Sequence, residues 1–150
     1  MSRWRPRATV AAVVYREGRY LLVEESDPVS GRRVLNQPAG HLEPGESLAA
    51  AARREVFEEM GWEVELLAVI GVSRYAPGPS DLTFLRTTFL ARPRHRVVGA
   101  VIDPAIEASH WLAYEAIRAR SATLRSPLVL AAVERHRAGD YFPLGILFDA

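Results

Sequence analysis

The sequence predicts an α+β fold, with most of its strands before the last helices. Three features support this prediction: two short β-prone runs near the start, two longer ones in the middle, and two helical patterns with capping residues at their ends. The chain has 150 residues, a length that suits one domain, which we place at residues 1–150.

The chain begins with a predicted hairpin. Residues 9–15 (TVAAVVY) and 19–25 (RYLLVEE) have the composition of strands, and the turn REG joins them. Residues 26–32 (SDPVSGR) are rich in turn formers and predict a loop. Residues 34–38 (VLNQP) predict a brief strand that ends at Pro38, because proline has no amide hydrogen to donate to a neighbouring strand.

A helix is predicted from about Leu48 to Met60, after a loop that contains two glycines and a proline. Ser47 stands where an N-terminal capping side chain is needed. Gly61 stands where the chain needs the left-handed conformation that ends many helices.

The second half of the chain predicts two more strands and further helices. Residues 62–75 and 81–92 are strand-like, with the turn APGPS between them, and residues 110–120 suggest the end of a strand followed by a short helix. A last helix begins at Pro127, after the capping residue Ser126, and ends at a glycine.

The overall composition excludes several kinds of site and partner. Hydrophobic residues make up 49% and charged residues 25% of the chain, as in ordinary globular proteins. A formal net charge of +1 gives no general attraction to nucleic acid or membranes, so we expect neither as a partner. The absence of cysteine excludes disulfides, thiolate metal sites and cysteine nucleophiles. Without a recognisable signal peptide or membrane span, we expect a cytoplasmic protein.

Three glutamates share one face of the predicted helix. At about 100° per residue, Glu55, Glu58 and Glu59 fall within a sector of roughly 100°. The opposite half carries apolar side chains: Ala49, Val56, Phe57 and Met60. We therefore expect the helix to pack through its apolar side and to point all three carboxylates the other way. The alternative is a solvated surface helix, in which Arg54 partly neutralises Glu58 four residues later.

The loop before this helix favours a metal-binding interpretation. Like charges at this spacing repel unless a cation lies among them, and hard divalent cations such as magnesium prefer carboxylate and carbonyl oxygens. The segment GHLEPGES has the glycine spacing of a P-loop, but Glu46 stands where the lysine should be. A phosphate bound here would therefore need metal ions between it and the carboxylates.

The segment from Gly40 to Trp62 resembles the signature of the Nudix family. That signature is G, five residues, E, seven residues and R-E-U-x-E-E-x-G-U, where U is a bulky apolar residue. All of its positions are present at the family's spacing: Gly40, Glu46, Arg54, Glu55, Val56, Glu58, Glu59, Gly61 and Trp62. The segments LNQPAGHLE, LRSPLV and YFPL also resemble one bacterial branch, so the likeness spans nearly the whole chain. The resemblance implies a Nudix fold, with a mixed sheet between helices and the signature as loop–helix–loop.

The resemblance also implies a set of metal ligands and a reaction. The family hydrolyses a diphosphate linkage, using Mg²⁺ or Mn²⁺. Matching positions make Glu55, Glu58, Glu59 and the main-chain carbonyl of Ala39 the expected metal ligands. Glu55 or Glu59 is the expected general base, and Glu107 is a candidate outside the signature that is equally well explained as a surface residue.

The remaining signature residues have expected supporting roles. Arg54 would orient Glu55 by hydrogen bonding, and Gly40 would let the loop approach the metal. Glu46 would hold the loop against the helix, and Gly61 would end the helix.

Five residues outside the signature are candidates for substrate binding. Tyr75 lies at a strand end where a base can stack, and Arg74 beside it can meet a phosphate; core packing and a solvated loop are the alternatives. Asn36 and Gln37 precede the signature and face the expected pocket, unless Gln37 only satisfies main-chain groups. Arg86, in a predicted strand, points either at a polyphosphate or at solvent.

We therefore expect a magnesium-dependent hydrolase of nucleoside di- or triphosphates, or of a small pyrophosphate of the thiamine-pyrimidine type. One alternative is a sugar-nucleotide, dinucleotide or RNA-end pyrophosphatase. Another is a non-catalytic Nudix module that senses nucleotides, which the intact set of glutamates argues against. The expected partner is a small phosphoanhydride, and the protein is expected to be a monomer or a homodimer.

Overall fold

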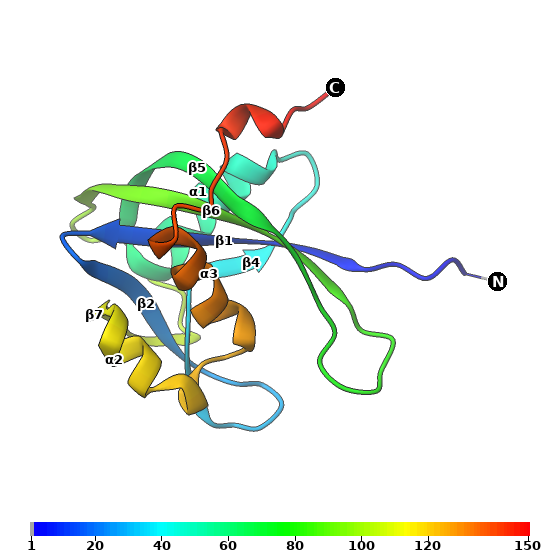
Figure 1. Cartoon of the computed structure of the whole chain (residues 1–150), viewed down its shortest axis with the longest axis horizontal. Coiled ribbons are helices and arrows are strands. Elements are labelled where there is room, and N and C mark those ends of the chain that lie inside the picture. The colour runs from blue at the N-terminus through cyan, green and yellow to red at the C-terminus, as the bar shows by residue number, and fades with distance from the viewer. Residues whose placement is uncertain (1) are drawn as a thin grey trace.

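The computed structural model describes residues 2–150, in which one mixed β-sheet carries helices on both of its faces (Figure 1). The strands are β1 (Arg7–Arg16), β2 (Arg19–Ser26), β3 (Arg33–Asn36), β4 (Ala39–His41), β5 (Trp62–Tyr75), β6 (Phe84–Arg96) and β7 (Ile106–Ala113). The helices are α1 (Leu48–Met60), α2 (Tyr114–Ala119) and α3 (Pro127–Arg137), with short 3₁₀ turns η1 (Ser121–Thr123) and η2 (Leu144–Ile146). The predicted α+β class is confirmed.

The two predicted long helices begin and end as their capping residues indicate. In α1 the Ser47 hydroxyl accepts a hydrogen bond from the Ala50 N–H at 3.1 Å, and Gly61 adopts a left-handed φ of 70°. In α3, which starts at Pro127, the Ser126 hydroxyl accepts from the Leu128 N–H at 3.2 Å. The capping interactions depend on residues close in sequence, and they form as predicted.

Three strand predictions need correction. The loop expected around Gly40 contains β4, a three-residue strand that pairs antiparallel with β1. Strand β6 begins at residue 84 rather than 81 and continues to residue 96, because irregular pairing with β5 extends along its whole length. Strand β7 begins at residue 106 rather than 110, since its partner β2 supplies a ladder that local composition does not reveal.

Strands β1 and β2 diverge as they leave their shared turn, and this divides the sheet. The strand order is β3-β2-β1-β6-β5, with β1 and β6 parallel, while β4 joins β1 and β7 joins β2. The β1–β2 register covers the turn end of the hairpin, from Val14↔Leu21 to Arg16↔Arg19. Further along, the first half of β1 pairs with β4 and the second half of β2 pairs with β3 (Figure 1).

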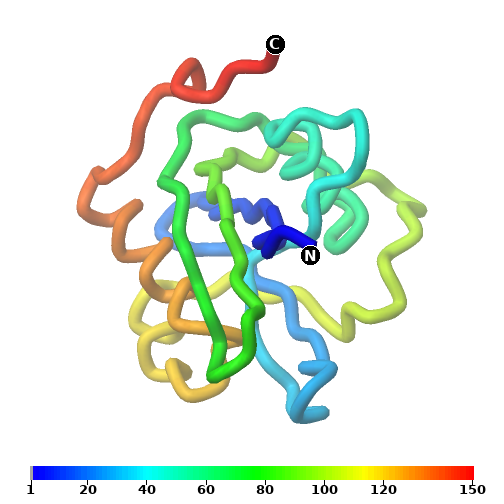
Figure 2. Tube along the Cα trace, turned by 90° about the vertical axis from the view of Figure 1, so that its right-hand side faces the viewer, coloured from blue at the N-terminus to red at the C-terminus, as the bar shows by residue number. Residues whose placement is uncertain are grey.

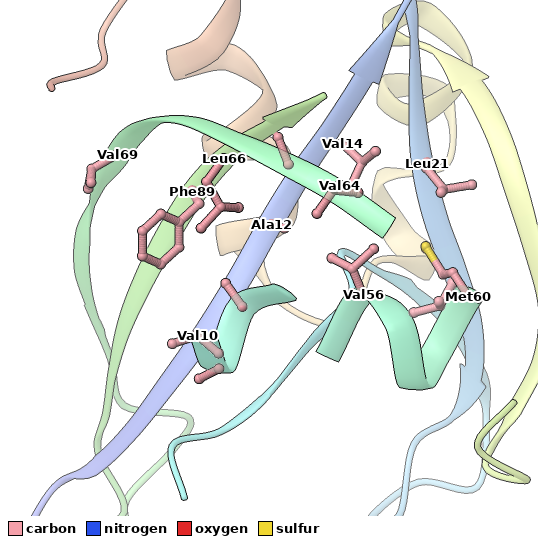
Figure 3. Close-up of a cluster of buried hydrophobic side chains, with 14 residues drawn as sticks. Val10, Ala12, Val14, Leu21, Val56, Met60, Val64, Leu66, Val69 and Phe89 are labelled. Atoms are coloured by element: carbon pink, nitrogen blue, oxygen red, sulfur yellow. The ribbon is translucent and has the colours of Figure 1, made fainter. Parts of the chain in front are cut away.

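Two hydrophobic clusters lie on opposite faces of the sheet, because successive side chains of a strand alternate in direction. The first packs α1 against β1, β5 and β6 and includes Val10, Ala12, Val56, Met60 and Phe89 (Figure 3). The second lies under α2 and α3 and includes Val13, Tyr20, Ile70, Ile117, Val129 and Val133. Figure 2 shows α1 and the α2–α3 pair on opposite sides of the long β5–β6 hairpin.

His136 of α3 lies in an aromatic cluster at the edge of the second hydrophobic cluster. Its Nδ1 lies 2.7 Å from the Tyr20 hydroxyl, and the rings of Tyr15 and Tyr141 flank it at centroid distances of 4.6 and 6.1 Å. Burial, followed by the charge of Arg137, lowers the pKa of His136 below its ordinary value. Burial raises the pKa of Tyr20 to about 12. Both side chains are therefore neutral near pH 7.

Among residues 2–150, no helix has both the length and the apolar character needed to cross a bilayer.

Candidate active site

Arg54 fastens the signature loop to helix α1. Its Nε donates to Glu46 Oε2 at 3.0 Å and its Nη2 to Glu46 Oε1 at 2.6 Å, a two-point pair that suits the planar guanidinium. Nη2 also donates to the His41 main-chain oxygen at 3.0 Å. Glu46 Oε1 accepts a further hydrogen bond from the Glu43 N–H at 2.8 Å. These contacts hold the pKa of Glu46 below its ordinary value.

The same arginine contacts two glutamates of α1. Its Nη1 lies 2.7 Å from Glu55 Oε1 and 3.2 Å from Glu58 Oε2. The same atom lies 3.7 Å from Glu43 Oε1, so with Glu46 one cation serves four carboxylates. Glu55 also fills the space beside Gly40, because a Cβ at position 40 would overlap its carboxyl group. Burial raises the pKa of Glu55, while the hydrogen bond from Arg54 acts in the opposite direction. Gly40 thus makes room for the carboxylate of Glu55.

Glu59 is buried, which corrects the expectation that all three glutamates point away from the packed side of α1. It is 5% exposed, whereas Phe57, expected to be buried, is 37% exposed. Around a helix Glu59 lies roughly 40° from Glu55, at the border of the packed face. Strand β4 lies against this border, and Glu59 Oε1 accepts the Ala39 N–H at 2.7 Å.

The environment of Glu59 disfavours its charged form. Burial raises its pKa to about 8, and the nearby negative charges of Glu25, Glu55 and Asp103 add to the effect, against the hydrogen bond from Ala39. None of the ion pairs among residues 2–150 involves Glu59. A buried carboxylate with one hydrogen bond and several acidic neighbours is a place where a bound cation would be stabilising.

The residues fit a hard divalent cation by their chemistry, although their present side-chain positions do not form a complete site. Glu55, Glu58 and Glu59 offer carboxylate oxygens on adjacent turns of one helix. In the part of the chain that the structure describes, no three acidic or histidine side chains converge on one point. Arg54 contacts one oxygen each of Glu55 and Glu58, so an ion shared with Glu59 would compete with this arginine for both carboxylates.

Arg86 lies inside the protein, so the alternative that it faces solvent is wrong. It is 7% exposed, and its Nη2 donates to Gln37 Oε1 at 2.8 Å. Its two Nη atoms lie 3.5 Å from Asn36 Oδ1, and its Nε has no hydrogen-bond partner among residues 2–150. Burial lowers the pKa of Arg86 to about 10, with the negative charges of Glu25 and Glu59 acting in the opposite direction. At neutral pH this is still a buried cation.

Gln37 is hydrogen-bonded both to Arg86 and to helix α3. Its Nε2 donates to the main-chain oxygen of Val129, at the start of α3, at 2.8 Å, while its Oε1 accepts from Arg86. Gln37 therefore does bind a main-chain group, as one of the two expectations had it. It also binds Arg86, which the sequence did not suggest. Its amide links the buried arginine to α3.

Sequence reasoning missed Glu25 and Arg125, and gave Asn36 no definite role. Glu25 Oε1 accepts from Asn36 Nδ2 at 3.3 Å and from Arg125 Nη1 at 2.9 Å. Glu25 ends the apolar run of β2 and Arg125 lies in the segment LRSPLV, but no local pattern pairs residues 100 positions apart. Only the tertiary fold brings them together.

The other substrate candidates lie at the end of the β5–β6 hairpin. Arg86 pairs with Ser73, so alternation places Tyr75 on the same face of the sheet as Arg86 and Arg74 on the opposite face. Arg74 is exposed and Tyr75 half-buried. Tyr75 therefore stays a candidate on the Arg86 face.

Glu107 has a surface environment. Arg33 Nε lies 2.6 Å from its Oε2, and the Ser26 hydroxyl donates to its Oε1 at 3.0 Å. The plain interpretation as a surface glutamate accounts for these contacts.

A cavity of about 670 Å³ has none of the three signature glutamates in its lining. It is lined by the first turn of α1, by β5 and by C-terminal residues that include Leu144, Ile146 and Phe148.

The mixed sheet is divided beside an acidic helix, and an arginine holds the loop that leads into this helix. This arrangement is that of a hydrolase domain of the Nudix type. Residues 5–132 match the family profile described as NUDIX domain, and the chain belongs to the Nudix hydrolase family.

Relatives with assigned names support the same assignment. The chain is 35% identical over 146 residues to the proteins named Phosphatase NudJ of Escherichia coli (strain K12) and Shigella boydii, an alignment that covers 97% of this chain and 93% of each relative. The predicted likeness to this bacterial branch is thereby confirmed. A solved Nudix hydrolase from Nitrosomonas europaea is 39% identical, with a TM-score of 0.92 over 97% of this chain and 98% of that one.

Proposed function

We propose that this Nudix hydrolase cleaves a diphosphate linkage in a nucleoside di- or triphosphate, or in a small pyrophosphate of the thiamine-pyrimidine type. The observation that carries the proposal is the placement of opposite charges at the divided sheet. Glu55, Glu58 and Glu59 lie on α1, and the charge of Glu59 acts on the buried cation Arg86, which has no ion pair among residues 2–150. A polyphosphate with a bound divalent cation would complement both.

The glutamates are proposed to hold the cation, Mg²⁺ or Mn²⁺, together with the main-chain oxygen of Ala39. A bound divalent ion would neutralise phosphate oxygens and lower the pKa of a nearby water. Hydrolysis then depends mainly on alignment of water, phosphorus and leaving group. Glu55 or Glu59 is proposed to take the proton of the attacking water.

The remaining residues position these groups. Arg54 fixes Glu55 and, through Glu46, the loop before the helix. Arg86 is proposed to contact a phosphate oxygen while Gln37 fixes its guanidinium. Tyr75 is proposed to pack against the base or ring of the substrate, and Arg74 to add positive charge at the rim.

A substrate panel with magnesium present or chelated tests the proposal, with phosphate and pyrophosphate measured separately. Nucleoside phosphates, small pyrophosphates, sugar nucleotides, dinucleotides and RNA 5′ ends release different products, so the panel separates the proposed substrates from the alternatives. Hydrolysis should stop when the metal is chelated. Nucleotide binding without any turnover would instead identify a sensing module.

The variant that tests the site is Glu59→Gln, which keeps the size of the side chain and removes its ability to become a carboxylate. The rate should fall by about a hundredfold or more. Glu63→Gln is the control, because Glu63 is exposed and its only ion pair among residues 2–150 is with His95 at 3.5 Å. A folded Glu59→Gln variant with the activity of the parent would refute the site assignment.

A further inference from the structure

We infer that Arg86 and Arg125 together form an anion-binding subsite, which holds a phosphate group of the substrate that the signature glutamates do not hold. The inference rests on the proposed function and adds to it a second arginine, supplied by the segment before α3. Arg86 would form the buried end of this subsite and Arg125 its partly exposed end.

The incomplete bonding of Arg86 is the first argument. None of the ion pairs within 4.0 Å among residues 2–150 involves this buried guanidinium. Its Nε has no partner, its contacts with Asn36 Oδ1 are long at 3.5 Å, and the bond to Gln37 at 2.8 Å is its one short hydrogen bond. Buried charges in proteins are normally paired and fully hydrogen-bonded. An anion in contact with Arg86 would satisfy both requirements.

The position of Arg125 is the second argument. Its N–H donates to the Leu35 main-chain oxygen at 2.8 Å, which fastens the segment before α3 to β3. Its side chain is 34% exposed, and its Nη1 binds Glu25 Oε1 at 2.9 Å. Asn36 donates to the same Glu25 oxygen and accepts from Arg86, so one amide joins both arginine environments. The charge of Arg125 also acts on Arg86 and lowers its pKa.

Phosphate is the anion that this pair fits. Guanidinium groups bind phosphate oxygens through two parallel hydrogen bonds, and a tetrahedral phosphate can accept from two arginines at once. Arg86 is nearly inaccessible, so a compact group must reach it. Arg125 is partly exposed and can turn from Glu25 to an incoming phosphate. Glu25 thus holds Arg125 ready while the subsite is empty.

Binding of inorganic phosphate and pyrophosphate to the metal-free protein tests this inference. With a chelator present, each anion should raise the unfolding temperature of the parent above its value in chloride of equal ionic strength. Arg125→Gln should weaken this binding about tenfold or more, because a charge-assisted contact is lost. Arg33→Gln is the matched control, since Arg33 also pairs with a carboxylate, Glu107, but among residues 2–150 has no side-chain hydrogen bond or ion pair with Asn36 or Arg86. This control should bind both anions like the parent.

Kinetics with metal present give a second measurement. Arg125→Gln should raise KM more than it lowers kcat, and Arg33→Gln should change neither. The inference is overturned if the parent gains no stability from either anion, if Arg125→Gln binds them as tightly as the parent, or if the control loses as much. If anion binding depends on Arg125 but no diphosphate is hydrolysed, the proposed function fails and the subsite stands. If the parent hydrolyses a diphosphate and Arg125→Gln does so equally well, the proposed function stands and the subsite fails.

Discussion

Replacing Gly40 with alanine should displace one carboxylate of the site while leaving the fold nearly intact. The added Cβ would lie 2.5 Å from Glu55 Oε2 and closer still to the rest of the carboxyl group, whereas ordinary contacts begin near 3.4 Å. The carboxylate must therefore shift by about an ångström, and a displacement of that size can lower an enzymatic rate by about a hundredfold. The carboxyl group of Glu55 is the flexible end of its side chain. Its displacement should therefore lower the free energy of unfolding by little more than the lost hydrogen bond to Arg54, about 1 kcal/mol.

The assay for Gly40→Ala combines kcat/KM with the free energy of unfolding from a denaturant titration. A large fall in kcat/KM with a loss of stability near 1 kcal/mol is the expected outcome. Gly145→Ala is the control, because a Cβ there meets nothing within 4 Å, and it should match the parent in both measurements. Parent-like activity in Gly40→Ala would refute the reasoning. So would a loss of several kcal/mol, which would mean that the main chain moves instead.

Two further predictions concern stability. Since the pKa of His136 is lower in the folded protein than the ordinary value of 6.5, the unfolded chain binds a proton more readily. The contribution of His136 is therefore fully present above pH 6.5 and is lost as the pH falls through its folded pKa; denaturant titrations from pH 8 to 5 should show this fall, and His136→Phe should reduce it. Ser126→Ala removes the hydroxyl that caps α3 at the Leu128 N–H, and should lower the free energy of unfolding by about 1 kcal/mol with activity retained. A variant as stable as the parent would show that the cap contributes nothing.

The sequence predicts those parts of the fold whose causes are local. Helix α1 begins after Ser47 and ends at Gly61, because capping depends on residues within one turn of each end. Strand β4 has no such signal, since three residues with a central glycine become a strand only because β1 lies beside them. The late start of β6 and the early start of β7 likewise depend on their partner strands.

The candidate site follows the same rule. The spacing of the signature identifies Glu55, Glu58 and Glu59, but a helical wheel gives relative angles and does not say what packs against each side. The burial of Glu59 is set by β4, and the meeting of Glu25 with Arg125 by contacts across 100 positions of sequence. These are tertiary contacts between residues far apart in the chain, and local sequence patterns do not predict them.

The contacts of Arg54 have a consequence for the protein before any ion arrives. This side chain already offsets the repulsion between Glu46, Glu55 and Glu58, so helix α1 can form and dock in ion-free solution. A cation that bound at the proposed site would compete with Arg54 for these carboxylates. Its observed affinity would be weakened by the free energy of any arginine contacts that it replaced, and those contacts could form again when it left, without a change in the rest of the domain.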